Sequence, residues 1–164
     1  MSAQARVWYF AYGSNLNVDQ MRKRIGEWRL SKRATARNYA VEFNHFSKNW
    51  QGYTANLKKT DRFEDMVHGV VYHIGEDQLR ALLRIEGEGS ALLDIHVELE
   101  DGNEISHAKA IVWNSSEKEH EPSKTYRKMM EEGFSQHGFA ESYEKSLFGK
   151  FELGQRNSEQ QRKQ

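Results

Sequence analysis

The residues best suited to bind a charged ligand lie in the segment 12–16, which reads Tyr-Gly-Ser-Asn-Leu. The segment follows an apolar run and precedes a pattern typical of a helix start. A glycine at such a turn lets the backbone come close to a ligand, and the amides at a helix start point outward. The turn is therefore suited to hold a carboxylate or an oxyanion. The structural alternative makes Gly13 only a turn residue, with Ser14 and Asn15 as local caps.

A second segment offers acid–base chemistry. Residues 83–89 read Leu-Arg-Ile-Glu-Gly-Glu-Gly and place Glu86 between an apolar helix end and a pair of glycines. Burial there would raise the pKa of this carboxyl group, as proton transfer near neutral pH requires. The structural alternative makes Glu86 a solvated residue at a helix end, with Gly87 as the C-cap. Because the chain has 24 acidic residues, position alone does not single out this one.

The elements that must position these residues begin with a strand. Residues 7–12 are apolar on both faces of a strand, which predicts a buried central strand that Gly13 ends. Asn17 is a plausible N-cap of the following helix, with Gln20 in the capping-box position, and Gly26 can close that helix. The chain therefore begins with a strand, a tight turn and a helix.

Alternating strands and closing helices complete the predicted domain. Asp101-Gly102 is a hairpin signal, Pro122 suits a first helical position, and Gly138 is a good helix end. Strands are expected near residues 34–43, 53–57, 67–74, 93–99 and 105–113, and helices near 79–86, 122–137 and 139–147. Because strands and helices do not alternate regularly, the class is α+β with a twisted, mostly antiparallel sheet. Residues 1–151 form one domain, and residues 152–164 are predicted to be a disordered polar tail.

Composition excludes several classes of protein. Lys and Arg together number 24, as do Asp and Glu, so the net charge is zero and argues against a nucleic-acid partner. The sequence has no cysteine and no membrane-spanning apolar run, and residues 1–6 lack the apolar region of a signal peptide, so we expect a cytoplasmic protein without a membrane partner. Its seven histidines are scattered outside any metal-binding motif, so no metal site is expected. The basic residues between Arg22 and Arg37 are interpreted as a solvated face, with an anionic ligand or RNA as the alternative.

Five segments resemble one known family. Residues 9–16 (YFAYGSNL) are similar to the N-terminal signature of the gamma-glutamylcyclotransferase family, and residues 85–87 (IEG) resemble the segment that bears its catalytic glutamate. Three further matches are weaker individually: 50–57 (WQGYTANL), 68–74 (HGVVYHI) and 122–126 (PSKTY). All five occur in family order and span nearly the whole domain.

The resemblance implies a barrel-like sheet with flanking helices, no cofactor and no metal. It also implies cleavage of a small γ-glutamyl amide by its own α-amine, releasing 5-oxoproline and a free amine. The protein would then be a monomer or homodimer whose partner is a small-molecule γ-glutamyl substrate. The resemblance assigns general acid–base catalysis to Glu86. The substrate-binding residues that it implies are Tyr9, Tyr12, Gly13, Ser14, Asn15, Leu16 and Tyr126.

One position departs from the family pattern. Members commonly have a tyrosine at the start of the strand after the catalytic glutamate, where this chain has Leu93. Leu93 is expected to point inward and to make the substrate pocket larger and less polar. The alternative function is a catalytically silent member that binds an acidic metabolite or a protein partner. Glu86 distinguishes the two, because a silent protein has no need of a buried carboxylate.

Overall fold

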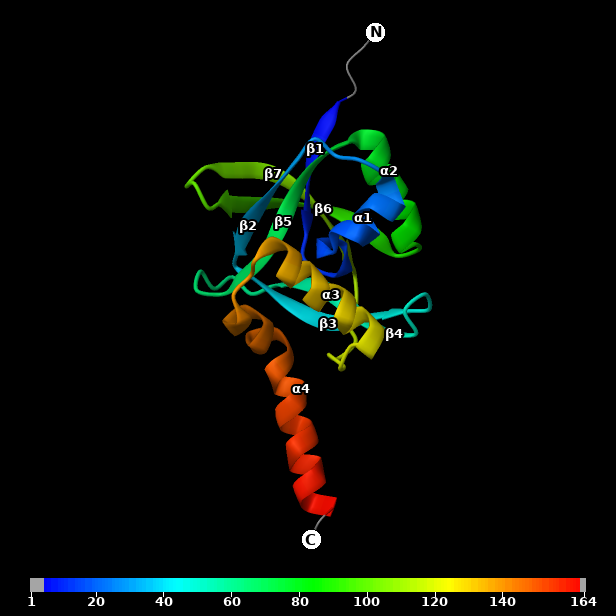
Figure 1. Cartoon of the computed structure of the whole chain (residues 1–164), viewed down its shortest axis with the longest axis vertical. Coiled ribbons are helices and arrows are strands. Elements are labelled where there is room, and N and C mark those ends of the chain that lie inside the picture. Colours follow the sequence, from blue (N-terminus) through cyan, green and yellow to red (C-terminus); the bar gives the residue numbers. More distant parts are fainter. Residues whose placement is uncertain (1–4, 163–164) are drawn as a thin grey trace.

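The computed structural model describes residues 5–162 and confirms the α+β class (Figure 1). Five strands close a barrel in the order β1-β5-β2-β6-β7. Their bounds are β1 Arg6–Ala11, β2 Leu30–Arg37, β5 Met66–Gly75, β6 Ser90–Leu99 and β7 Glu104–Trp113. Strands β3 Tyr39–Ser47 and β4 Gly52–Lys59 form a separate two-stranded sheet. The helices are the 3-10 turn η1 Ser14–Leu16 and helices α1 Val18–Ile25, α2 Glu76–Glu86, α3 Lys124–His137 and α4 Glu141–Arg162.

The barrel is mostly antiparallel, as the sequence predicts. Strand β5 pairs antiparallel with β1 on one side and with β2 on the other, and β6 pairs antiparallel with β7. One parallel pairing, Tyr9 with Lys109, joins β1 to β7 and closes the barrel. Strand β5 pairs with a neighbour along each edge, and its consecutive residues Val70, Val71 and Tyr72 are fully buried, so both of its faces are covered.

The sequence placed one strand over residues 34–43, whereas the structure has two. Asn38 separates them with a φ of 71°, a left-handed conformation that Asn tolerates better than most residues. Its backbone N–H donates to the carbonyl oxygen of Asp65 at 2.9 Å, which fixes the turn. As a result β2 joins the barrel and β3 leaves it for the hairpin with β4.

Three of the four predicted helix signals are confirmed. The Asn17 side chain accepts a hydrogen bond from the backbone N–H of Gln20. Gly26 and Gly138 follow the ends of α1 and α3. The prediction for Pro122 is wrong, because α3 begins at Lys124 after Ser123. The Ser123 hydroxyl caps this helix by accepting from the Tyr126 amide at 3.3 Å, a role that proline cannot fill.

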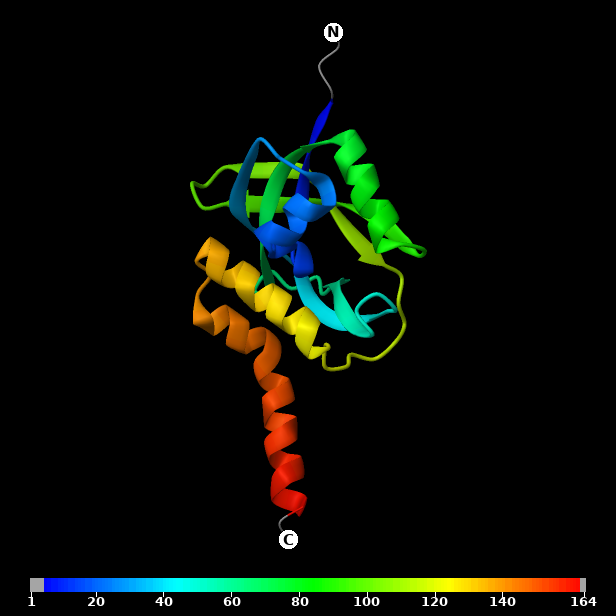
Figure 2. The ribbon, with the colours of Figure 1, turned by 45° about the vertical axis from the view of Figure 1, so that its right-hand side comes forward.

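The two C-terminal helices lie side by side before α4 extends away from the body (Figures 1 and 2). Phe134 of α3 and Phe148 of α4 have ring centroids 6.4 Å apart. The range predicted to be a disordered tail, residues 152–164, overlaps the end of α4, which runs to Arg162, and the disorder of this range stays a prediction. Extending an existing helix costs little, and Gln, Arg and Glu favour it without any apolar stripe. Residues 1–4 and 163–164 of the predicted domain and tail lie outside the described residues.

Candidate active site

The loop after β1 is held by hydrogen bonds and packing from β5 and α3. The Tyr72 hydroxyl on β5 donates to the carbonyl oxygens of Asn15 (3.0 Å) and Leu16 (3.3 Å). The His137 ring contacts the same Leu16 carbonyl through Nε2 at 2.8 Å. Helix α3 packs closely on this loop because Gly133 has no side chain, and a Cβ there would lie 2.8 Å from the Leu16 carbonyl carbon. Strand β5 and helix α3 therefore fix the conformation of the loop.

Gly13 is required for space. A Cβ at this position would lie 2.5 Å from the Tyr126 hydroxyl oxygen and 3.3 Å from the Ala55 Cβ. The φ of Gly13 is −121°, so a left-handed conformation is not the reason for a glycine. The Tyr126 oxygen accepts hydrogen bonds from the backbone amides of Ser14 (3.3 Å) and Ala55 (3.1 Å). Tyr126 thus joins the loop to β4, and Gly13 permits that junction.

Glu86 ends α2 beside this loop and is largely buried. Its side chain is 19% exposed, and Oε1 accepts from Arg24 Nη1 at 3.0 Å and from Asn15 Nδ2 at 3.4 Å. Burial raises the pKa of Glu86 above its ordinary value, and the Arg24 guanidinium and the two hydrogen bonds oppose that rise. The interpretation of Glu86 as a solvated residue at a helix end is therefore wrong.

Asn15 is the centre of a buried polar network. Its Nδ2 donates to the Tyr9 hydroxyl at 2.9 Å. Its Oδ1 accepts from Gln20 Nε2 at 2.9 Å and from Arg24 Nη1 at 3.0 Å. Gln20 Nε2 also donates to the Ser14 hydroxyl at 2.8 Å. The interpretation of Ser14 and Asn15 as simple caps does not hold, because Asn17 is the cap and Asn15 orients the groups around Glu86.

Two of these network residues were not identified from the sequence. Arg24 was assigned to a solvated basic face, and Gln20 only to helix capping, yet both side chains point into the site. Their spacing of four residues places them on one face of α1. That spacing could have identified both residues from the sequence. The helix face that carries Gln20 and Arg24 also carries the buried Met21, so it is not simply a solvated face.

The polar groups line a small cleft that encloses about 30 Å³, roughly the volume of one water molecule. Tyr12 forms part of its floor and donates through its hydroxyl to the Ile111 carbonyl at 2.5 Å. The sequence-predicted residues that line the cleft are Tyr9, Tyr12, Gly13, Ser14, Asn15, Glu86 and Tyr126. The lining residues not identified from the sequence are Trp50, Thr54, Ala55, Ile111 and Trp113. Leu16 belongs to the loop, but its side chain is fully buried and, among the described residues, it is not part of the lining of the cleft.

The expectation that Leu93 lines the substrate pocket is wrong for this cleft. Leu93 is half-buried on β6 and pairs with Ala110, whereas the cleft residue Ile111 pairs with Leu92. Successive side chains on a strand point to opposite faces, so Leu93 and Ile111 lie on opposite faces of this strand pair. Leu93 shares its face with the buried Ile95, which belongs to the core.

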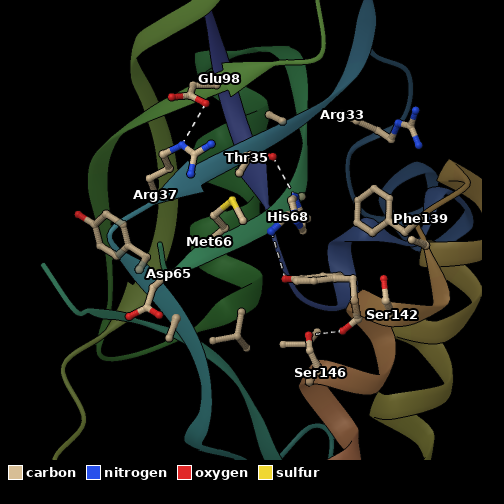
Figure 3. Close-up of a pocket in the computed structure, with 18 of the residues that line it drawn as sticks. Arg33, Thr35, Arg37, Asp65, Met66, His68, Glu98, Phe139, Ser142 and Ser146 are labelled. Carbon is tan, nitrogen blue, oxygen red and sulfur yellow. Dashed lines mark hydrogen bonds and ion pairs between the residues drawn. The ribbon is translucent and has the colours of Figure 1, made fainter. Parts of the chain in front are cut away.

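A larger cavity of about 790 Å³ lies elsewhere, between strands β2 and β5 and the first turns of α4 (Figure 3). Its polar groups bind one another. Arg37 Nε pairs with a Glu98 oxygen at 3.3 Å, and the Thr35 hydroxyl contacts His68 Nδ1 at 2.9 Å. Burial lowers the pKa of His68, which leaves its ring neutral near pH 7. None of the sequence-predicted site residues lines this cavity, so we place the chemistry in the smaller cleft.

Neither a metal-binding cluster nor a membrane-spanning helix occurs in the described part of the chain. Among the side chains of residues 5–152, no three His, Asp or Glu are grouped so that they could hold a metal ion. In the same range, no helix combines the length and apolar character needed to cross a membrane.

Comparisons with known proteins point to one family. The family model described as gamma-glutamyl cyclotransferase, AIG2-like, matches residues 9–130, which include every residue that lines the cleft. A gamma-glutamylcyclotransferase from Mus musculus is 27% identical over 146 residues, covering 85% of this chain and 76% of that protein. A solved structure named gamma-glutamyl cyclotransferase is 23% identical with a TM-score of 0.77, covering 87% of this chain and 86% of that one. An uncharacterized protein from Homo sapiens has the same TM-score and coverage at 25% identity.

Proposed function

This chain belongs to the gamma-glutamyl cyclotransferase, AIG2-like family, and from that premise we propose that it cleaves a small γ-glutamyl amide into 5-oxoproline and a free amine. One observation supports this most: Glu86 is a buried carboxylate of raised pKa, hydrogen-bonded to Arg24 and Asn15 beside a glycine loop. The substrate is a small molecule, and we place the reaction in the cytoplasm, in a monomer or homodimer. The comparisons support the family; the substrate and the mechanism are our proposal.

The proposed reaction explains why the site needs so few groups. The α-amine of the substrate attacks its own γ-carbonyl carbon, a five-membered ring forms, and the bond to the leaving nitrogen breaks. Because nucleophile and electrophile belong to one molecule, correct folding of the substrate can supply effective molarities of roughly 10⁵–10⁸ M. Neither a serine nor a cysteine nucleophile is required. The Ser14 hydroxyl accordingly has a structural role, as an acceptor for Gln20.

Glu86 performs the proton transfers in this scheme. It takes a proton from the substrate ammonium, which frees the amine to attack, and returns that proton to the leaving nitrogen as the bond to the leaving nitrogen breaks. The ring nitrogen then loses its second proton to the same carboxylate, which passes it to the released amine. A group that both takes and returns protons works best when its pKa lies near the working pH, and burial moves the pKa of Glu86 in that direction. Such proton transfer typically contributes about 10²–10⁴-fold to a rate. Arg24 and Asn15 keep the carboxylate aimed at the cleft.

The backbone amides of the loop differ in their availability to an oxyanion. The Ser14 amide already donates to Tyr126, and the Leu16 amide donates to the Gly13 carbonyl at 3.1 Å. Among the hydrogen bonds of the described residues, the amides of Gly13 and Asn15 donate none. We therefore assign these two amides as the donors to the tetrahedral intermediate. Loss of one such donor typically costs about 2.7–4 kcal/mol of transition-state stabilisation.

A panel of γ-glutamyl compounds tests this function. The purified protein is incubated with γ-glutamyl amino acids and γ-glutamyl alkylamines, with and without a strong chelator, and 5-oxoproline is measured. We expect 5-oxoproline from at least one compound, and the same rate with chelator, because the reaction needs no Lewis acid. Binding of such compounds without turnover would instead support the silent alternative. Loss of activity with chelator that zinc or manganese restores would refute the metal-independent mechanism.

A further inference from the structure

Trp113, at the end of β7, presents a buried polar atom without a partner. Within residues 5–162, two buried side-chain nitrogens lack a hydrogen bond, Nδ1 of His73 and Nε1 of Trp113. Of these two residues, Trp113 lines the cleft and His73 does not. A buried donor without an acceptor destabilises the fold, so it calls for an explanation. A ligand acceptor that enters the cleft would provide one.

The Trp113 backbone and the Trp113 ring are each held by neighbouring side chains. Buried Asn56 brackets its backbone: Oδ1 accepts from the Trp113 amide at 3.1 Å, and Nδ2 donates to the Trp113 carbonyl at 2.8 Å. The same Nδ2 donates to Asn44, which is also buried. The His45 ring stacks on the indole at a centroid distance of 4.3 Å and an angle of 13°. Burial lowers the pKa of His45, so this stacking partner is neutral near pH 7.

Differences in burial divide the cleft into a floor and a mouth. Tyr9, Tyr12 and Tyr126 are almost fully buried and form the floor near the loop. Trp50 and Trp113 are only partly buried and form the mouth, where Trp50 packs edge-on against the Tyr126 ring at 5.2 Å. In the proposed reaction the γ-glutamyl group must reach the loop and Glu86. The leaving amine then extends from the floor toward the mouth.

We propose that the indole N–H of Trp113 recognises a hydrogen-bond acceptor on the leaving amine, the carboxylate of an amino acid, and so determines which γ-glutamyl amides are cleaved. This inference rests on the proposed function and adds a residue that discriminates between substrates. Because the indole nitrogen of Trp113 is buried, the proposal requires the mouth of the cleft to open when the leaving amine binds.

A matched pair of substrates tests the proposal. The leaving amine of γ-glutamyl-alanine differs from that of γ-glutamyl-ethylamide by one carboxylate. We expect wild-type kcat/KM to be about tenfold higher for the alanine compound, the size of effect that one hydrogen bond to a charged group can give. Trp113→Phe keeps an aromatic ring against His45 but removes the donor. It should abolish this preference by lowering the alanine value alone. Trp8→Phe on β1 makes the same substitution outside the cleft and should leave the ratio unchanged.

The possible outcomes separate the two proposals. Turnover of either substrate with a ratio that Trp113→Phe does not change would overturn the role of Trp113 and leave the proposed function intact. A lack of 5-oxoproline from every γ-glutamyl compound would overturn both. A second readout does not depend on turnover: the indole N–H resonances of ¹⁵N-labelled Glu86→Gln protein. We expect γ-glutamyl-alanine, and not the ethylamide, to move the Trp113 resonance downfield. Dipeptide binding that shifts other resonances but not this one would refute the proposed hydrogen bond.

Discussion

The cavity between β2, β5 and α4 encloses about 790 Å³, and the cleft beneath the β1 loop encloses about 30 Å³. In the cavity each charged group named above pairs with a neighbour of opposite charge, such as Arg37 with Glu98. In the cleft Glu86 also pairs with a cation, Arg24, but this carboxylate is buried and accepts a further hydrogen bond from Asn15. A site that moves protons needs a group whose charge is costly to bury. Convergence of buried polar groups therefore identifies the candidate site better than volume does.

The cleft and the cavity also differ in the contacts that form their walls. The cleft is built on hydrogen bonds between distant segments, for example from the amides of Ser14 and Ala55 to Tyr126. The cavity lies where two elements meet at an angle, β2 of the barrel and the first turns of α4 (Figure 3). We expect substitutions in the cleft to affect catalysis and matched substitutions in the cavity to have little effect. The predictions below test this contrast.

The largest effect is expected for Glu86→Gln, which should lower kcat by about 10²–10⁴-fold because glutamine transfers no proton. The matched control is Glu98→Gln in the large cavity, which should retain full activity. Burial raises the pKa of Glu86, so its contribution to the free energy of unfolding is greatest when protonated and declines as pH rises through that pKa. Glutamine keeps the neutral form at every pH. The melting temperature of Glu86→Gln at pH 7 should therefore not fall.

Equal losses of activity in Glu86→Gln and Glu98→Gln would contradict the predicted difference between the cleft and the cavity. Retention of more than a few per cent of the wild-type activity in Glu86→Gln would show that another group transfers the proton.

A smaller but still large effect is expected for Gly13→Ala. The new Cβ must displace the Tyr126 hydroxyl, and a shift of about 1 Å in a positioned group can cost roughly 10²-fold in rate. Overpacking should lower the free energy of unfolding by about 1–3 kcal/mol. Adding Tyr126→Phe removes the clashing oxygen but leaves the Ser14 and Ala55 amides without their acceptor, so the double variant should recover neither stability nor activity. Gly149→Ala on α4 has nothing within 4 Å of its Cβ and should stabilise by about 0.5–1 kcal/mol. Assays and denaturant unfolding of the four proteins measure both quantities.

The third effect is a change in pH dependence. Free enzyme needs Glu86 ionised, so kcat/KM falls as pH falls through its pKa. Arg24 holds that pKa down against the effect of burial. Arg24→Ala should therefore move the acidic limb of the profile to higher pH. Arg37→Ala, which removes the partner of Glu98 in the large cavity, should leave the limb in place. If the acidic limb of the kcat/KM profile does not move in Arg24→Ala, a group other than Glu86 determines its position.

The sequence predicted the local parts of this comparison better than the contacts between distant parts. The capping of α1 by Asn17 and the glycine turn at Gly13 were readable because they depend on neighbours in the chain. The break at Asn38 was missed because its left-handed backbone interrupts an otherwise continuous strand pattern. Trp50 and Trp113 were missed because they come from a hairpin loop and a strand end that only the tertiary fold brings together.

The Leu93 expectation failed for a related reason. Alternation along β6 correctly assigns Leu93 to the face shared with Ile95. It does not show which face of the strand pair borders the cleft. That depends on the register with β7, where Ile111 lies opposite Leu92. A register is a tertiary property that the alternation of one strand leaves undetermined.

The smallest effect is expected where α4 leaves the body. Its first turns line the large cavity through residues such as Ser142 and Ser146, and Glu152 Oε1 still pairs with Arg127 at 2.6 Å. Beyond Glu152 the helix extends away from the barrel (Figures 1 and 2). A chain truncated after Glu152 keeps both the cavity wall and that ion pair, so we expect unchanged kcat/KM and a melting temperature within about 2 °C of wild type. Truncation after Leu147 is the control, because it removes Phe148, which stacks on Phe43 at 5.6 Å, and should destabilise clearly. If removal of only the residues after Glu152 lowers the melting temperature by several degrees, the end of α4 packs against the body.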